Sequence, residues 1–228
     1  MSTPDSTVDI AGTHGPDAIV EALSLDIVLG RLRPQSRLVE DELMLRFGAK
    51  RHVVRAALDG LAASGLVERR PKKGAVVRDY SIEEVRELYA FRADLHRLAV
   101  AKMPLPLPRP VIDCLSAEAT AHEAAIAAGD LASVIRHNDA FHELLFAQCG
   151  NRFVIDSIRR LDAASRAIRS YRVGDPDRLR QAAAEHREMI ATAASDDREA
   201  LGEQCVRHIL PSLQLFLTDS HVALAPGS

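Results

Sequence analysis

The strongest constraint on the fold is the spacing of apolar residues after residue 80, where they recur at steps of three and four. This spacing places them on one face of an α-helix and predicts that the face is buried against other helices. Turns containing glycine divide the region at Gly129-Asp130, Gly150-Asn151 and Gly174-Asp175-Pro176. Helices are therefore predicted over residues 81–103, 109–128, 131–149, 151–172, 177–195 and 197–219. Because no convincing strand interrupts them, residues 80–222 are predicted to form an all-α domain, a bundle of six to seven helices.

The start of the first of these helices is specified by the sequence Ser81-Ile82-Glu83-Glu84. Ser81 is predicted to cap the helix N-terminus, and Glu84 to bond back to the cap residue, as in a capping box. At the other end, the stretch PLPLPRP of residues 104–110 forces the chain out of the helix. The sequence thus predicts one long helix between these two signals.

Residues 17–79 are predicted to form a second, smaller domain. Apolar spacing predicts helices over residues 17–29, 39–47 and 50–65, and Gly48 is typical of a helix end. The segments LVERR and AVVRD then alternate weakly around the turn PKKG, which is typical of a β-hairpin with a basic tip. Three helices and such a hairpin predict a winged helix-turn-helix, so the whole chain is predicted to be mainly α. Residues 1–16 are predicted to be a disordered tail.

Positive charge is concentrated in this smaller domain. Residues 46–78 contain nine Lys or Arg and two Asp or Glu, a local charge of +7, whereas the whole chain has a formal net charge of −3. The exposed cationic positions near the start of the third predicted helix are Lys50, Arg51, His52 and Arg55. Arg51 and Arg55 share a helix face and can both bond guanine edges in one major groove of double-stranded DNA. Lys72 and Lys73 at the wing tip are predicted to contact phosphates or the minor groove.

Histidines interrupt three of the apolar stripes in the larger domain. In HNDAFHELLF, residues 137–146, Asn138 and His142 lie one turn apart on the buried face, and His186 and His208 occupy such positions on two later helices. A buried imidazole needs a hydrogen-bond partner or a metal, because burying it unpaired costs about 1–3 kcal/mol. Three core-facing histidines in one bundle therefore predict a metal site; core histidines satisfied by hydrogen bonds are the alternative.

The remaining composition excludes several other classes of protein. There is no run of about 18 uncharged apolar residues, and residues 1–16 lack the charged-then-apolar order of a signal peptide. The three cysteines are an odd number without paired spacing, which argues against a disulfide framework. These features predict a globular cytoplasmic protein that does not associate with membranes.

Residues 37–77 read RLVEDELMLRFGAKRHVVRAALDGLAASGLVERRPKKGAVV. They resemble the DNA-binding domain of the GntR family of bacterial transcription regulators, whose pattern includes L-x-E-x-x-L-A, V-S-R-T-P-V-R-E-A-L and E-G-L-V before a glycine-tipped wing. The matching positions are Arg51, Val54, Arg55, Ala57, Leu58, Leu61, Gly65, Leu66, Val67 and Gly74. The resemblance implies binding to a DNA operator, with Gly74 at the wing.

The chain departs from this pattern at four positions of the recognition helix. The family's Ser, Thr, Pro and Glu are here Lys50, His52, Val53 and Ala56. Lys50 cannot cap the helix, which loses about 1 kcal/mol, but it adds a charge that can reach DNA. The operator is therefore predicted to differ from that of typical relatives.

The region from about residue 81 to 220 is similar to the FCD ligand-binding domain of the FadR subgroup of GntR regulators. The resemblance rests on the pieces N-D-x-F-H and E-H-x-x-M-I and on a final histidine in the last helix. By position it implies Asn138, His142, His186 and His208 as ligands of a divalent ion such as zinc, nickel or manganese. Asn138 stands where many relatives have Asp, which weakens the site. The resemblance also implies that Arg92 faces the acid group of an effector; a surface salt bridge is the alternative.

These observations predict a metabolite-responsive transcriptional repressor that binds an inverted-repeat operator as a homodimer. Its effector is predicted to be a small organic acid bound at the metal. One alternative is a metal-free dimeric regulator that only spaces two DNA-binding domains. Another is a metal-dependent enzyme, although no general base beside the histidines can be identified from the sequence.

Overall fold

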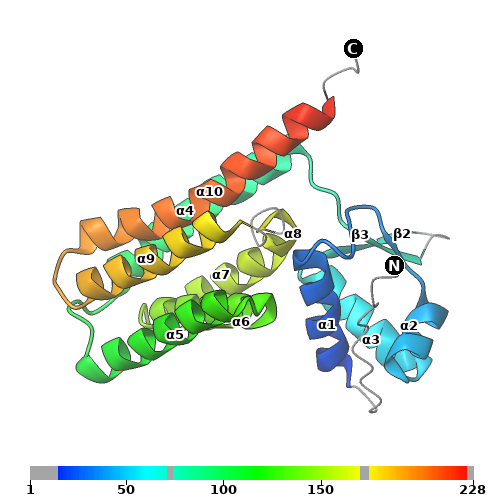
Figure 1. Ribbon diagram of the computed structural model, residues 1–228, viewed down its shortest axis with the longest axis horizontal. Coiled ribbons are helices and arrows are strands. Elements are labelled where there is room, and N and C mark those ends of the chain that lie inside the picture. The colour runs from blue at the N-terminus through cyan, green and yellow to red at the C-terminus, as the bar shows by residue number, and fades with distance from the viewer. Residues whose placement is uncertain (1–14, 71–73, 170–174, 225–228) are drawn as a thin grey trace.

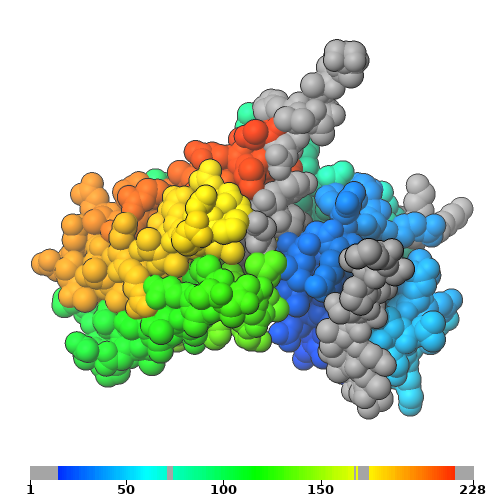
Figure 2. Space-filling model, in the orientation of Figure 1, coloured from blue at the N-terminus to red at the C-terminus, as the bar shows by residue number. Residues whose placement is uncertain are grey.

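The computed structural model describes residues 15–70, 74–169 and 175–224 of the chain. Figure 1 shows a small N-terminal part of helices and a short sheet, joined to a larger part made of long helices. The fold is mainly α, as predicted. In the space-filling view, the blue N-terminal part lies against the green part of the helical bundle (Figure 2).

The N-terminal part is a winged helix-turn-helix. Its elements are α1 (Pro16–Val28), β1 (Arg37–Leu38), α2 (Glu40–Phe47), α3 (Arg51–Ala63), β2 (Val67–Arg70) and β3 (Gly74–Val77). The three strands form an antiparallel sheet in the order β1-β3-β2, with Arg37 opposite Val76 and Glu68 opposite Val76 on the other side. Strand β1 was not predicted, because two residues are too few to show an alternating pattern.

The predicted apolar stripes form the core of this domain. On α3, Val54, Ala57, Leu58 and Leu61 are each 0% exposed and pack with the buried residues of α1 and α2. Helix α2 ends where the sequence predicts, because Gly48 adopts the left-handed conformation with φ +58°. The opposite face of α3 is left exposed to solvent.

The C-terminal part is an all-α bundle. Its helices are α4 (Ile82–Lys102), α5 (Arg109–Ala128), α6 (Leu131–Ala147), α7 (Arg152–Ala164), α8 (Arg166–Arg169), α9 (Pro176–Ala193) and α10 (Arg198–Leu224). The capping box at the start of α4 is confirmed, since the Glu84 backbone N–H donates to Ser81 Oγ and the Ser81 N–H donates to the Glu84 carboxylate. In Figure 1, α4 and α10 run side by side, and α5 lies beside α6.

One predicted helix differs from the structure. The helix predicted over residues 151–172 is divided at Ser165 into α7 and the short α8. The Ser165 hydroxyl donates to the carbonyl of Asp162, a local bond that competes with helix continuation. Helix α10, by contrast, continues through Pro211. The break at Ser165 places α8 against α1, where the two domains meet.

The two domains have separate apolar cores and also touch at Gly65. The Tyr80 hydroxyl donates to the Gly65 carbonyl at 2.7 Å. Gly65 has φ +79°, and a Cβ atom there would lie 3.1 Å from the Tyr80 hydroxyl and 3.4 Å from the Ala164 Cβ. Only glycine therefore fits this backbone and this close approach. Among the described residues, none of the helices combines the length and apolar character needed to cross a bilayer.

Candidate DNA-binding surface and candidate metal centre

The predicted DNA-contacting residues of α3 lie together at its N-terminus. Lys50 is the N-cap residue without a capping side-chain bond, and Arg51, His52 and Arg55 follow on the helix, all four exposed. Gly74 begins β3, with φ +76°. Lys72 and Lys73 lie outside the described residues. The start of α3 thus presents a cluster of cations to solvent.

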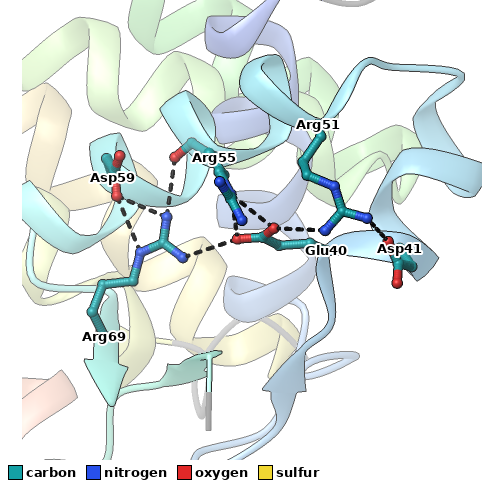
Figure 3. Close-up of polar contacts among 6 residues, drawn as sticks. All are labelled: Glu40, Asp41, Arg51, Arg55, Asp59 and Arg69. Carbon is teal, nitrogen blue, oxygen red and sulfur yellow. Dashed lines mark hydrogen bonds and ion pairs between the residues drawn. The ribbon is translucent and has the colours of Figure 1, made fainter. Parts of the chain in front are cut away.

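Glu40 organises the arginines of this surface. It lies at the start of α2, and its carboxylate accepts from Arg55 Nε at 2.9 and 3.1 Å and from Arg51 Nη1 at 3.3 Å (Figure 3). Asp41 accepts from Arg51 Nη2 at 2.5 Å. The side chains of Arg51 and Arg55 nevertheless remain 49% and 58% exposed. Both guanidinium groups therefore have defined acidic partners and are still exposed to solvent.

A third arginine, from the wing, joins the same network. Arg69 on β2 donates to Asp59 Oδ1 at 2.7 Å and to the Arg55 carbonyl at 3.2 Å, and its Nη1 lies 3.7 Å from Glu40 (Figure 3). Sequence reasoning assigned no role to Glu40 or Arg69. The signal for Glu40 was available, because it occupies the Glu position of the L-x-E-x-x-L pattern. The network links α2, α3 and the wing into one surface.

The three predicted histidines converge in the bundle. His142 on α6, His186 on α9 and His208 on α10 each offer a ring nitrogen, and these nitrogens lie within 4.8 Å of one another. His142 Nε2 and His186 Nε2 are 3.3 Å apart. Two nitrogens that each lie about 2.0–2.1 Å from a tetrahedral ion have about this separation. The separation of His142 and His186 therefore suits two ligands of one divalent ion, and His208 lies beside them.

A carboxylate behind the cluster orients one of these histidines. His208 Nδ1 lies 2.6 Å from Glu185 Oε2, and both side chains are 8% exposed. Because the carboxylate engages Nδ1, His208 Nε2 is left for a ligand, as in the carboxylate–histidine–metal arrangement of many metal sites. Glu185 directly precedes His186 in the sequence, but sequence reasoning gave it no role.

The electrostatic environment keeps His186 in the form that binds metals. Burial lowers the pKa of His186 well below its usual value, and the neighbouring His208 and His122 lower it further. A neutral imidazole retains the lone pair that a metal ligand requires. His186 is 0% exposed, so the nitrogen is available only to groups inside the bundle.

Asn138, the predicted oxygen ligand, lines the same cavity as His142 and His208. It is half-buried, one turn before His142 on α6, and its amide nitrogen donates to Asp139 Oδ1 at 3.2 Å. This bond uses the amide nitrogen of Asn138, so the amide oxygen is the atom that could bind a metal. Its role as a ligand stays a prediction.

Two buried histidines beside the cluster were missed. His122 on α5 is 1% exposed, and its ring centroid lies 5.0 Å from that of His186. His96 on α4 is 3% exposed and packs against Phe146 in a tilted arrangement, with a centroid distance of 4.5 Å. Both line the cavity. Each lies on the buried stripe of its helix, which was the available signal.

Arg92 lies in the cavity wall, not in a surface salt bridge. It is 4% exposed, and its Nη2 donates to Asp162 Oδ1 at 2.6 Å. Its Nε and Nη1 are buried and have no hydrogen-bond partner among the described residues. The cavity has a volume of about 220 Å³ and is lined by further arginines, among them Arg166, which pairs with Asp139 at 2.9 Å. Such a cavity suits a small anion.

Comparisons with known families match both domains. The model of bacterial regulatory proteins of the gntR family matches residues 16–77, and the FCD domain model matches residues 87–210. The HTH-type transcriptional repressor RspR of Escherichia coli K12 is 27% identical over 196 residues, 84% of each chain. The HTH-type transcriptional regulator YdhC of Bacillus subtilis is 25% identical over 180 residues, 78% of this chain and 80% of that protein.

Solved structures share the fold. E. coli McbR/YncC has a TM-score of 0.78 and 18% identity, with 90% of this chain and 98% of that chain covered. A GntR regulator from Rhodococcus sp. RHA1 has a TM-score of 0.72 and 20% identity, with 89% and 97% covered. The likeness therefore extends over both domains.

Proposed function

We propose that this chain, which belongs to the GntR family of bacterial regulatory proteins and carries an FCD domain, represses transcription until a small organic acid binds a metal in that domain. The observation that carries the sensing half of this proposal is the 3.3 Å approach of His142 Nε2 and His186 Nε2, beside the cavity that His142 and His208 line. Two neutral imidazoles in this position need a cation between them or a proton on one nitrogen. Repression is proposed because the E. coli relative RspR is named a repressor.

The DNA-binding part of the proposal is supported by the cationic residues at the N-terminus of α3. Lys50, Arg51, His52 and Arg55 would contact the major groove, and the wing residues Lys72, Lys73 and Gly74 would contact the adjacent backbone. One winged domain makes too few contacts for specific affinity at physiological salt. We therefore propose a cytoplasmic homodimer on an inverted repeat.

The metal would be held by His142, His186 and His208, with Asn138 as the weaker fourth ligand. Bound there, zinc, nickel or manganese would supply an uncancelled positive charge that attracts a carboxylate. His208 is held in position by Glu185, and burial keeps His186 neutral. Arg92 would bind the acid through Nε and Nη1, the two nitrogens that have no hydrogen-bond partner among the described residues.

A physical connection runs from the cavity to the DNA-binding domain. Val28, at the end of α1, is part of the cavity lining, as are Arg166 of α8 and Asp162 of α7. An acid that engages these residues would change the packing of α1 against α8, the contact that positions the DNA-binding domain on the bundle. This contact is our candidate route for the response.

Selection of operators from random DNA, followed by binding measurements, tests the DNA-binding half. Arg55→Ala is expected to lower affinity for the selected operator by about 1–3 kcal/mol and to relax base choice, whereas Lys72→Ala should weaken all sequences alike. Equal losses on selected and random DNA for both variants would show that the roles are misassigned.

A thermal-shift screen of organic acids, with and without added divalent metal, tests the sensing half. Stabilisation by acids is expected only when metal is present. A protein that gains nothing from metal, and nothing from acid with metal, would instead be the metal-free regulator.

A further inference from the structure

The wing contributes one arginine to the charge network at the start of α3, and this arginine is held differently from the other two. Arg69 on β2 donates from Nε and Nη2 to Asp59 Oδ1 at 3.1 and 2.7 Å, and from Nη2 to the carbonyl oxygen of Arg55 at 3.2 Å. Both acceptors belong to α3 (Figure 3). The position of Arg69 is therefore set by the body of the recognition helix and does not depend on Glu40.

Glu40 is surrounded by the guanidinium groups of three arginines. Its carboxylate accepts hydrogen bonds from Arg55 Nε and Arg51 Nη1. Arg69 Nη1 lies 3.7 Å from Glu40 Oε1, within ion-pairing distance. A carboxylate in this position needs a cation, because an uncompensated negative charge at a DNA-binding surface repels the phosphates. DNA binding therefore depends on which cation stays beside Glu40.

The three arginines differ in how easily DNA can draw them away from Glu40. The side chains of Arg51 and Arg55 are 49% and 58% exposed, and they carry the proposed contacts to the major groove. The side chain of Arg69 is 34% exposed, and two of its three nitrogens already bond to α3. Arg69 Nη1 can therefore stay beside Glu40 after the other two arginines have left.

We propose that Arg69 is a positioning residue for DNA binding, which neutralises Glu40 when Arg51 and Arg55 transfer to the operator. This inference rests on the proposed DNA-binding function and goes beyond it, because it gives the wing a task that needs no contact with DNA. Without Arg69, Glu40 would attract Arg51 and Arg55 more strongly, and its charge would face the phosphates whenever they left. Arg69 thus favours the release of both arginines to DNA.

Arg70, the next residue of β2, has the same charge but different partners. Its Nε and Nη2 donate to Glu68 at 3.1 and 3.0 Å, and its Nη1 donates to Gln35 at 2.9 Å. Successive side chains of a strand point to opposite faces, which separates Arg70 from the face that carries Arg69. The two side chains are almost equally exposed, 35% and 34%. They form a matched pair that differs in access to Glu40.

A double-mutant cycle on the full-length protein tests this role, with fluorescence anisotropy on the operator selected from random DNA. Arg69→Gln is expected to lower operator affinity about tenfold in the wild-type background. In the Glu40→Gln background, where no carboxylate needs a counter-ion, the loss should be only about two- to threefold. Arg70→Gln should lower affinity about two- to threefold in both backgrounds, as expected when one positive charge near DNA is removed.

An equal loss from Arg69→Gln in both backgrounds would overturn the proposal, because neither a direct phosphate contact nor a general disturbance of the wing depends on Glu40. Equally strong coupling of Arg70→Gln to Glu40→Gln would also overturn it. If Arg69→Gln is unfolded by circular dichroism, Arg69→Met replaces it with the same expectation, since Met keeps most of the aliphatic side chain. A cycle without coupling leaves DNA binding standing, whereas a wild type that selects no DNA sequence would overturn both proposals.

Discussion

The arginines at the start of α3 and the histidines of the cavity are held in place by different physical means. Arg51 and Arg55 are about half exposed, and their ion pairs with Glu40 lie at the protein surface, where such pairs contribute at most about 1 kcal/mol. Arg51 and Arg55 can therefore leave Glu40 and pair with DNA phosphates or bases at a small cost in free energy. His186 is fully buried, and its surroundings keep it neutral. The second arrangement is fixed by packing inside the bundle, where we propose that the histidines bind a metal.

The largest expected effect is a loss of bound metal, which should occur when a buried histidine of the cluster is replaced but not when another histidine of the bundle is replaced. His186→Ala removes one of three converging imidazoles, so divalent metal should fall from about one equivalent per chain to under a tenth. His137→Ala, on α6 and paired with Glu118, should keep the full equivalent. Elemental analysis of protein purified without chelator or nickel column measures both. Full metal content in both variants would show that the site is misplaced.

Burial in the cavity should also appear as a dependence of stability on pH. Burial lowers the pKa of His96 and His122 to about 4, whereas both protonate near pH 6.5 in the unfolded chain. Their contribution is therefore fully present above pH 6.5 and is lost as the pH falls toward 4, by at most about 3 kcal/mol for each. Urea unfolding of metal-free protein between pH 7.5 and 4.5 measures this loss.

The matched variant for this measurement is His96→Phe, which has one proton fewer to bind on unfolding. Its free energy of unfolding should fall less steeply with decreasing pH than that of the wild type. The same steepness in both proteins would show that folding does not lower the pKa of His96.

A smaller effect is expected where a buried group only orients a ligand. Glu185→Gln removes the charge that holds His208 Nδ1, so metal affinity should fall about 10- to 100-fold. Glu188→Gln is the control, because Glu188 lies on the same helix and pairs with Arg207 at the surface. Competition with a metal-binding dye measures both affinities. Equal affinities would indicate that Glu185 has only a structural role.

The smallest effect is expected at the exposed surface. Glu40→Gln removes a negative charge beside Arg51 and Arg55, so affinity for random DNA should rise about two- to fivefold while preference for the operator decreases. Glu42→Gln, an exposed residue of the same helix, should raise affinity without changing preference. Fluorescence anisotropy with operator and random duplexes measures the ratio. An unchanged ratio in Glu40→Gln would mean that Glu40 does not position the arginines.

Much of the fold follows from local pattern. The stripe on α3 and the capping box at Ser81 and Glu84 each depend on residues within a few turns of one another, so the sequence displays them directly. The break at Ser165 was missed because apolar spacing continues across it. At the break, the Ser165 hydroxyl donates to the Asp162 carbonyl.

Residues of the site could be predicted only where they interrupt the apolar stripe of their own helix. His142, His186 and His208 stand out on their stripes, and the structure brings them together. The pairing of Glu185 with His208 joins two helices, and so does the contact of His96 with Cys205, so neither partner can be found without the tertiary arrangement. The same holds for Arg69, which reaches Glu40 only through the packing of the wing on α3.

Coupling between the cavity and the DNA-binding surface is tested most directly by operator affinity, measured on zinc-loaded protein as an organic acid found by the thermal-shift screen is added. In the wild type, the acid is expected to weaken operator binding at least about fivefold, a coupling of about 1 kcal/mol. His186→Ala should bind the operator as the acid-free wild type does and should show no shift with the acid. A wild type that binds the acid without any change in operator affinity, or an equal shift in His186→Ala, would contradict the proposed link between the two regions.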